Sequence, residues 1–286
     1  MSAPARSARF DLSKGIRSTV EIRPSVSMPV LGLGVWQAAA GAPTQGAVRA
    51  ALDAGYRLID TAAMYGNEAD VGAAVRASGL PREEVFVTTK LRNDDQGFDR
   101  ALAAFERSRA ALDLGPLDLY LIHWPVRGER ERSWKALVEI QAAGKARSIG
   151  VSNFTVPQLE AFAASSDVVP SVNQVEFSPF LYQSELLEYC QRHDIQLEAY
   201  SPLVRGRRLD HPVVGSIAAA QARSPAQIIL RWDLQHGVIP IPKSVHPDRI
   251  RENAALFDFE LSPSEVARLD RLHEGLRVSW DPGRME

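Results

Sequence analysis

Four residues of different chemistry fall where short apolar segments end or shortly after: Asp60, Tyr65, Lys90 and His123. An Asp carboxylate can keep a buried Lys ammonium charged, because the opposite charge offsets the cost of burial. That ammonium would favour the phenolate form of a nearby Tyr. At about 4 Å and an effective dielectric constant near 20, the interaction is worth roughly 4 kcal/mol, or about three pKa units. We therefore expect the pKa of Tyr65 to lie below its ordinary value near 10.

A tyrosine tuned in this way suits proton transfer to an oxygen atom while a hydride reaches the carbon bonded to it. A neutral imidazole can donate a hydrogen bond to a carbonyl oxygen and orient it. The protein has no hydride source of its own, so this chemistry requires a nicotinamide cofactor. Together the four residues predict a carbonyl reductase.

Each of these residues also has a structural interpretation when taken alone. Asp60 can cap a helix, Tyr65 can pack half-buried in a loop, and His123 can be a structural group beside its strand. Lys90 is harder to explain in this way, since the chain has five lysines against 28 arginines. Two other functions therefore stay open: a Schiff-base lyase or aldolase with Lys90 as nucleophile, and a catalytically silent nucleotide-binding module.

Other kinds of site are disfavoured by spacing. The histidines are far apart and never in an i, i+4 pair, so no metal site is expected; they lie at 123, 193, 211, 236, 246 and 273. The nucleophile motif G-x-S-x-G is absent, which argues against a serine hydrolase. The single cysteine, Cys190, excludes an intramolecular disulfide framework and a cysteine metal cluster.

An alternation of short apolar segments and longer helical segments would position these residues. The expected strands are 30–36, 57–60, 85–90, 117–124, 146–153, 171–177, 196–202 and 238–244. Several are apolar at consecutive positions, as is typical of parallel strands buried on both faces. No linker divides the chain, and about 250 residues is the usual size of a (β/α)8 barrel. The pattern predicts one α/β domain, a TIM barrel over residues 18–286.

Several local signals refine this prediction. Hydroxyl residues near the start of a helical stretch predict helices at 45–54, after Thr44, and following Thr155 and Ser224. Further helices are expected at 100–112 and 248–256, and an extra C-terminal one at 264–272. Residues 18–29 predict a β-hairpin that plugs the barrel floor, and residues 1–17 are expected to be disordered.

Composition limits the partners of this protein. The 286 residues carry a net charge of −2, so there is no basic excess for nucleic acid. No apolar run approaches the ~20 residues of a membrane span. The first 20 residues lack the apolar stretch of a signal peptide. We expect a monomeric cytoplasmic enzyme that acts on a small-molecule carbonyl compound.

Six sequence blocks resemble the aldo-keto reductase family, in the order found in that family. They are DTAAMYGNE (60–68), LIHWP (121–125), IGVSNF (149–154), NQVEFSP (173–179), AYSPL (199–203) and IPKSVHPDRIREN (241–253). The match covers about residues 20–276, and the short loops are most similar to bacterial members that include 2,5-diketo-D-gluconic acid reductases. The resemblance implies NADPH-dependent reduction of aldehydes and ketones on a (β/α)8 barrel.

The resemblance also implies a role for each catalytic candidate. Tyr65 would be the general acid, Lys90 the partner that tunes its pKa, and Asp60 the counter-ion of Lys90. His123 would orient the substrate carbonyl. Trp36 and Trp124 would add apolar walls to a substrate pocket around Tyr65 and His123, and Trp280 of the C-terminal tail could reach it.

A larger set of residues would bind the cofactor. Tyr200 would stack on the nicotinamide ring, and Ser152, Asn153 and Gln174 would bind its carboxamide. Lys243, Ser244 and Arg249 surround a helix N-terminus, where free N–H groups and the helix dipole favour an anion, here the 2′-phosphate of NADPH. The remaining members are Gly34 and Trp36, Ser201 and Leu203 near the pyrophosphate, Val245, and Glu252 and Asn253 at the adenine edge.

Overall fold

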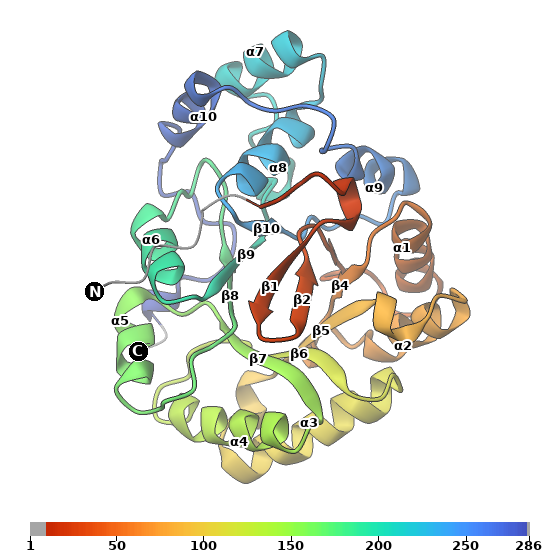
Figure 1. The fold of residues 1–286 in the computed structure, drawn as a ribbon, viewed down its shortest axis with the longest axis vertical. Coiled ribbons are helices and arrows are strands. Elements are labelled where there is room, and N and C mark those ends of the chain that lie inside the picture. The colour runs from red at the N-terminus through yellow and green to blue at the C-terminus, as the bar shows by residue number, and fades with distance from the viewer. Residues whose placement is uncertain (1–9, 285–286) are drawn as a thin grey trace.

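Eight parallel strands follow one another around a central barrel in the computed structural model, which describes residues 10–284 (Figure 1). Their hydrogen-bonded order is the order of the chain. They are β3 (Leu33–Gly34), β4 (Leu58–Asp60), β5 (Phe86–Leu91), β6 (Leu117–Ile122), β7 (Ala146–Ser152), β8 (Val172–Glu176), β9 (Gln196–Tyr200) and β10 (Ile239–Pro240). A parallel bridge between Gly34 and Lys243 joins the first and last strands. The predicted (β/α)8 barrel is confirmed.

The seam between β3 and β10 depends on small residues. The Gly32 N–H donates to the Pro240 carbonyl at 3.1 Å, and the Gly34 N–H donates to the Pro242 carbonyl at 3.3 Å. A Cβ on Gly34 would lie 2.9 Å from the carbonyl oxygen of Ile241, closer than real Cβ contacts allow. Glycine at position 34 is therefore needed for barrel closure, whatever it contributes to a ligand.

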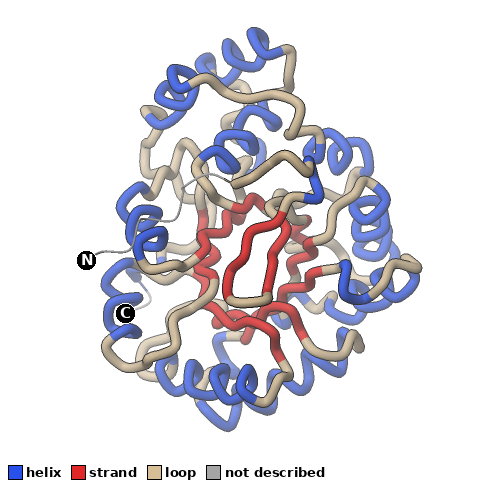
Figure 2. The backbone as a smooth tube through the Cα atoms, in the orientation of Figure 1, coloured by secondary structure: helices blue, strands red, loops and turns tan. Residues whose placement is uncertain are grey.

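Helices surround the strands on the outside of the barrel (Figure 2). They are α1 (Ala42–Asp53), α2 (Glu68–Ala77), α3 (Phe98–Leu112), α4 (Arg130–Ala142), α5 (Val156–Ala163), α6 (Ser184–Arg192), α8 (Pro225–Gln235) and α9 (Pro247–Ala254). Two additional helices, α7 (Pro212–Gln221) and α10 (Pro263–Asp270), lie beside each other at the top of Figure 1. The extra C-terminal helix is thus confirmed.

Helix starts show where the sequence signals were sufficient. Thr155 and Ser224 each form a capping box at the start of their helices, as predicted. The predicted cap at Thr44 is wrong: α1 begins at Ala42 after Gly41, and the Thr44 hydroxyl donates to the Ala39 carbonyl at 2.7 Å. A hydroxyl inside the first turn bonds back to the preceding loop and does not mark the helix boundary.

An antiparallel hairpin, β1 (Thr19–Arg23) and β2 (Val26–Pro29), lies at the centre of the strand ring in Figure 1. Its buried side chains Ile22, Val26 and Met28 share a hydrophobic cluster with residues at the starts of barrel strands, such as Leu58 and Phe86. The hairpin therefore closes the N-terminal end of the barrel, as predicted.

The segment expected to be disordered, 1–17, is described only in part. Residues 1–9 lie outside the described residues. Residues 10–17 include a 3-10 turn (Gly15–Arg17), and Phe10, Leu12 and Ile16 pack against the core. These apolar contacts order the chain several residues earlier than the sequence suggests.

Candidate active site

The C-terminal ends of β4, β5 and β6 bring the four catalytic candidates together. Lys90 Nζ lies 2.7 Å from each carboxylate oxygen of Asp60, 2.8 Å from the Thr61 carbonyl and 3.4 Å from the Tyr65 hydroxyl. The rings of Tyr65 and His123 meet edge to face, with centroids 5.7 Å apart. Lys90 and Asp60 are buried, and Tyr65 is half-buried. A charged pair thus lies beside a phenol, which in turn contacts an imidazole.

The loop after β4 holds Tyr65 in this position. Tyr65 ends a 3-10 turn (Ala63–Tyr65), which Gly66 closes with φ +68°, a conformation that favours glycine. The Thr61 hydroxyl donates to Asn67 Oδ1 at 2.7 Å, and Asn67 Nδ2 donates to the Val35 carbonyl at 3.1 Å. Polar side chains on both sides of the turn therefore fix it to the barrel.

The charges around Lys90 and His123 determine their protonation. Burial acts to lower the pKa of Lys90, but the charges of Asp60, Tyr65 and Glu198 and the Asp60 hydrogen bonds raise that pKa above its ordinary value. Burial and the Lys90 charge hold the pKa of His123 well below its ordinary value. The site therefore contains an ammonium and a neutral imidazole.

The pKa of Tyr65 differs from the expectation. Burial raises the pKa of Tyr65 to about 12, although the Lys90 charge acts to lower it; Asp60 and Glu198 add to the increase. The predicted net lowering of the Tyr65 pKa is wrong, because loss of water around the hydroxyl outweighs one ammonium that is itself paired with a carboxylate.

Four of the predicted cofactor residues form one hydrogen-bonded network beside this pair. The Ser152 hydroxyl donates to the backbone carbonyl of Gln174 at 2.7 Å. Asn153 Nδ2 donates to Ser152 Oγ and to the His123 carbonyl, both at 3.0 Å, and Asn153 Oδ1 accepts from the Tyr200 hydroxyl at 2.8 Å. The network links the ends of β7, β8 and β9 to the strand end that carries His123.

The basic residues after β10 lie at the barrel seam. Lys243 pairs with Gly34 across the seam, and both Lys243 and Arg249 are exposed, with no ion pair to any residue within 10–284. The N-cap of α9, His246, makes no side-chain cap. Ser244 Oγ accepts from the His246 N–H at 3.1 Å. Two cations and an uncapped helix end fit a phosphate group.

The other predicted cofactor residues are distributed around this region. Ser201 (φ +49°) begins the loop after β9, and Leu203 and Val245 pack half-buried against the core. Glu252 is exposed on α9, whereas Asn253 is buried, so only Glu252 reaches the surface there.

The loop after β9 crosses toward the end of β3. Val204 and Arg205 both have left-handed backbone, with φ of +49° and +53°. The Arg205 guanidinium lies 4.6 Å from the ring centroid of Trp36, which is 37% exposed. This contact brings a cation next to an apolar wall of the predicted substrate pocket.

The C-terminal tail reaches the end of the barrel at which the strands have their C-terminal ends, which we call the mouth. The ring centroids of Trp280 and Trp124 are 5.4 Å apart, and Trp124 is buried while Trp280 is 58% exposed. The buried Glu176 side chain accepts from the backbone N–H groups of Val278 at 2.6 Å and Ser279 at 3.1 Å. Sequence reasoning missed Glu176 as the anchor of this tail.

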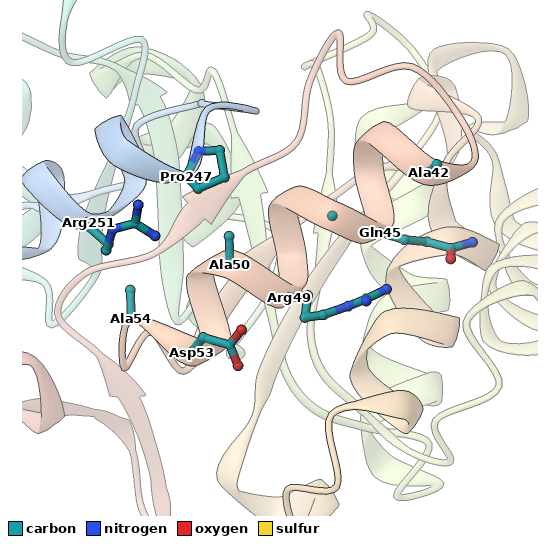
Figure 3. Close-up of a pocket in the computed structure, with 9 residues that line it drawn as sticks. Ala42, Gln45, Arg49, Ala50, Asp53, Ala54, Pro247 and Arg251 are labelled. Atoms are coloured by element: carbon teal, nitrogen blue, oxygen red, sulfur yellow. The ribbon is translucent and has the colours of Figure 1, made fainter.

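A cavity also lies away from the mouth. The outside of the barrel has a cavity of about 580 Å³ between α1 and α9, lined by residues such as Arg49 and Arg251 and by none of the four catalytic candidates (Figure 3). Within residues 10–284 no three His, Cys, Asp or Glu side chains are grouped as metal ligands. No helix of that part is long and apolar enough to cross a membrane.

Comparison with known proteins agrees with this geometry. The family model "Aldo/keto reductase family" matches residues 30–274. The glyoxal reductase of Bacillus subtilis (strain 168) is 48% identical over 270 residues, which cover 94% of this chain and 98% of the relative. The 9,11-endoperoxide prostaglandin H2 reductase of Trypanosoma cruzi (strain CL Brener) is 49% identical, with 92% and 94% covered.

A solved structure is similar as well. The crystal structure of a Bombyx mori aldo-keto reductase in complex with NADP superimposes with a TM-score of 0.86 at 36% identity, covering 91% of this chain and 94% of that chain. Family model, relatives and structure agree over nearly the whole barrel, and the chain belongs to the aldo/keto reductase family.

Proposed function

We propose that this chain reduces aldehydes and ketones to alcohols with NADPH. The observation that carries the proposal is the Tyr65 hydroxyl at 3.4 Å from an ammonium that is itself paired with Asp60. Tyr65 donates its proton to the substrate carbonyl oxygen. The neutral His123 imidazole donates a hydrogen bond to the same oxygen and orients the carbonyl. Lys90 stabilises the phenolate that remains, and Asp60 holds Lys90 in place.

NADPH, when bound, supplies the hydride that the carbonyl carbon accepts. Ser152, Asn153 and Gln174 would bind its carboxamide, and the Tyr200 ring would lie against its nicotinamide. Lys243, Arg249 and the N-terminus of α9 would bind its 2′-phosphate. The remaining predicted cofactor residues would line the same site: Gly34, Trp36, Ser201, Leu203, Ser244, Val245, Glu252 and Asn253. The NADP complex of the Bombyx mori relative supports this assignment.

The substrate would enter among aromatic side chains. Trp36, Trp124 and Trp280 form apolar walls, and Tyr65 and His123 supply the polar end. The reductase names of two relatives support a small-molecule carbonyl substrate.

The Lys90 lyase is disfavoured by the contacts of Lys90. A nucleophilic amine must lose its proton, but Lys90 donates to Asp60 and to Thr61, and its pKa is raised. The other alternative, a catalytically silent nucleotide-binding module, is tested by measuring whether the protein turns over a carbonyl substrate.

We also propose one cytoplasmic, monomeric domain over residues 18–286, against which Phe10, Leu12 and Ile16 pack from outside these bounds. Among the described residues, three of the four exposed large hydrophobic side chains (Trp36, Met64 and Trp280) belong to the loops and tail near the mouth. That arrangement leaves little apolar surface for association. Size-exclusion chromatography with light scattering tests the oligomeric state, and a stable dimer contradicts it.

Tyr65→Phe tests the proposed function. Because phenylalanine lacks the proton-donating hydroxyl, carbonyl turnover should fall by about a thousandfold or more. NADPH binding, followed by protein fluorescence, should stay within about twofold of wild type, because the ring remains. Wild-type-like turnover in this variant rejects Tyr65 as the acid, and absence of turnover in the wild type with tight NADPH binding favours the silent module.

A further inference from the structure

A second carboxyl group lies beneath the Asp60–Lys90 pair. Glu198 is in β9 and has no solvent exposure. Gln174 Nε2 donates to Glu198 Oε2 at 2.7 Å and to Asp60 Oδ2 at 2.7 Å. Glu198 is the register partner of Gln174 on β8 and of Ile239 on β10, so its immediate strand neighbours are an amide and an alkyl side chain.

This arrangement fixes the orientation of the Gln174 amide. The –NH2 group has two hydrogens, and the two carboxyl groups accept one each. A flipped amide would turn its carbonyl oxygen toward Asp60, a carboxylate that pairs with Lys90 and has no hydrogen to donate, and would lose that hydrogen bond. The Gln174 side chain can therefore use only its carbonyl oxygen to bind anything else.

We propose that Glu198 is a positioning residue of the cofactor site, which holds the Gln174 amide so that its carbonyl oxygen accepts a hydrogen bond from the nicotinamide carboxamide. The inference rests on the proposed use of NADPH and adds a residue to that site. Glu198 contacts no reacting atom. It acts through Gln174, with Asp60 as the second acceptor on the same nitrogen.

The charges around Glu198 are compatible with this role. The titratable groups that face it are Asp60 from β4, Lys90 from β5 and Tyr65 from the loop after β4. Burial, and next the charge of Asp60, raise the pKa of Glu198 to about 8. Burial also raises the pKa of Asp60, against the lowering effect of Lys90. A carboxyl oxygen accepts from Gln174 in either protonation state, so glutamine at position 198 can replace it.

Two substitutions separate the acceptor from the charge. Glu198→Gln keeps a carbonyl acceptor, and NADPH should bind within about twofold of wild type. Glu198→Met keeps a similar shape without an acceptor, and should weaken NADPH binding about tenfold, the size of one buried hydrogen bond. Affinity is measured by fluorescence titration, independently of turnover, and thermal melts show whether each variant is folded.

A double-mutant cycle shows whether Glu198 acts through Gln174. In a Gln174→Leu background, Glu198→Met should have no further effect on NADPH affinity. An equal tenfold loss in that background, or unchanged affinity after Glu198→Met alone, overturns the proposal. If Glu198→Met does not fold, Glu198→Ala takes its place in the same cycle. Failure of the wild type to bind NADPH would instead reject the proposed function.

Discussion

Removing the Asp60–Lys90 pair should weaken Tyr65 as an acid by a predictable amount. The Lys90 ammonium lies 3.4 Å from the Tyr65 hydroxyl. At an effective dielectric constant of about 20, this separation corresponds to about 5 kcal/mol in favour of the phenolate, or between three and four pKa units. The Asp60 charge acts in the opposite direction, so removing both charges changes the pKa of Tyr65 by less than this. Because burial already raises the pKa of Tyr65 to about 12, loss of the Lys90 ammonium leaves a phenol that gives up a proton poorly.

The suitable perturbation is the double variant Asp60→Asn/Lys90→Met. Lys90→Met alone would leave a buried, unpaired carboxylate, which costs about 3–5 kcal/mol of stability. Neutralising both partners avoids that cost. Since general acid catalysis contributes about 10²–10⁴-fold, we expect the rate of aldehyde reduction to fall by at least about a hundredfold.

The assay is single-turnover reduction with enzyme in excess, so that product release does not limit the rate. NADPH affinity and thermal melting serve as controls for an intact fold. A double variant that binds NADPH normally and reduces the aldehyde within about tenfold of the wild-type rate refutes the assigned role of Lys90.

Three further predictions concern the cofactor, the tail and stability. Lys243→Ala or Arg249→Ala should each weaken NADPH binding about tenfold and leave NADH binding unchanged; equal losses for both cofactors contradict a 2′-phosphate site. Glu176→Gln places an amide –NH2 against one of the two backbone N–H donors of the tail and should free Trp280. The KM for bulky aromatic aldehydes should then rise about fivefold or more, while small aldehydes react as before. An unchanged KM for both kinds of aldehyde shows that the tail does not contact substrate. Burial raises the pKa of Asp233, whose oxygens have no partner within residues 10–284. Its neutral form therefore stabilises the fold at acid pH, and this contribution is lost as pH rises through the folded-state pKa. Asp233→Asn should raise the free energy of unfolding by about 1–3 kcal/mol at pH 9 and by less at pH 5. Thermal melts at the two pH values measure this difference, and an equal change in melting temperature at both contradicts the reasoning.

The barrel could be predicted because its signals are local. Apolar runs identify the eight strands, and strand order then places Asp60, Lys90 and His123 at one end. The extra helix α7 was not predicted, since PVVGSIAAAQ has no pronounced apolar stripe and follows a loop rich in arginine.

The electrostatics could not be predicted from spacing. The expected lowering of the Tyr65 pKa used the Lys90 charge but not the burial of the phenol, which depends on the whole fold. Glu198 had one available signal, a charged residue inside the strand QLEAY, whose first four residues are buried. A carboxyl group in such a strand requires a partner, and here that partner is Gln174.

One attachment of the tail to the barrel does not depend on the side chains of the tail. Glu176 binds the backbone N–H groups of residues 278 and 279, which any amino acid except proline provides. Mutations at these two positions, other than to proline, therefore keep this backbone anchor. In a designed library, the tail can therefore be varied while Asp60, Tyr65, Lys90, His123 and the barrel core stay constant.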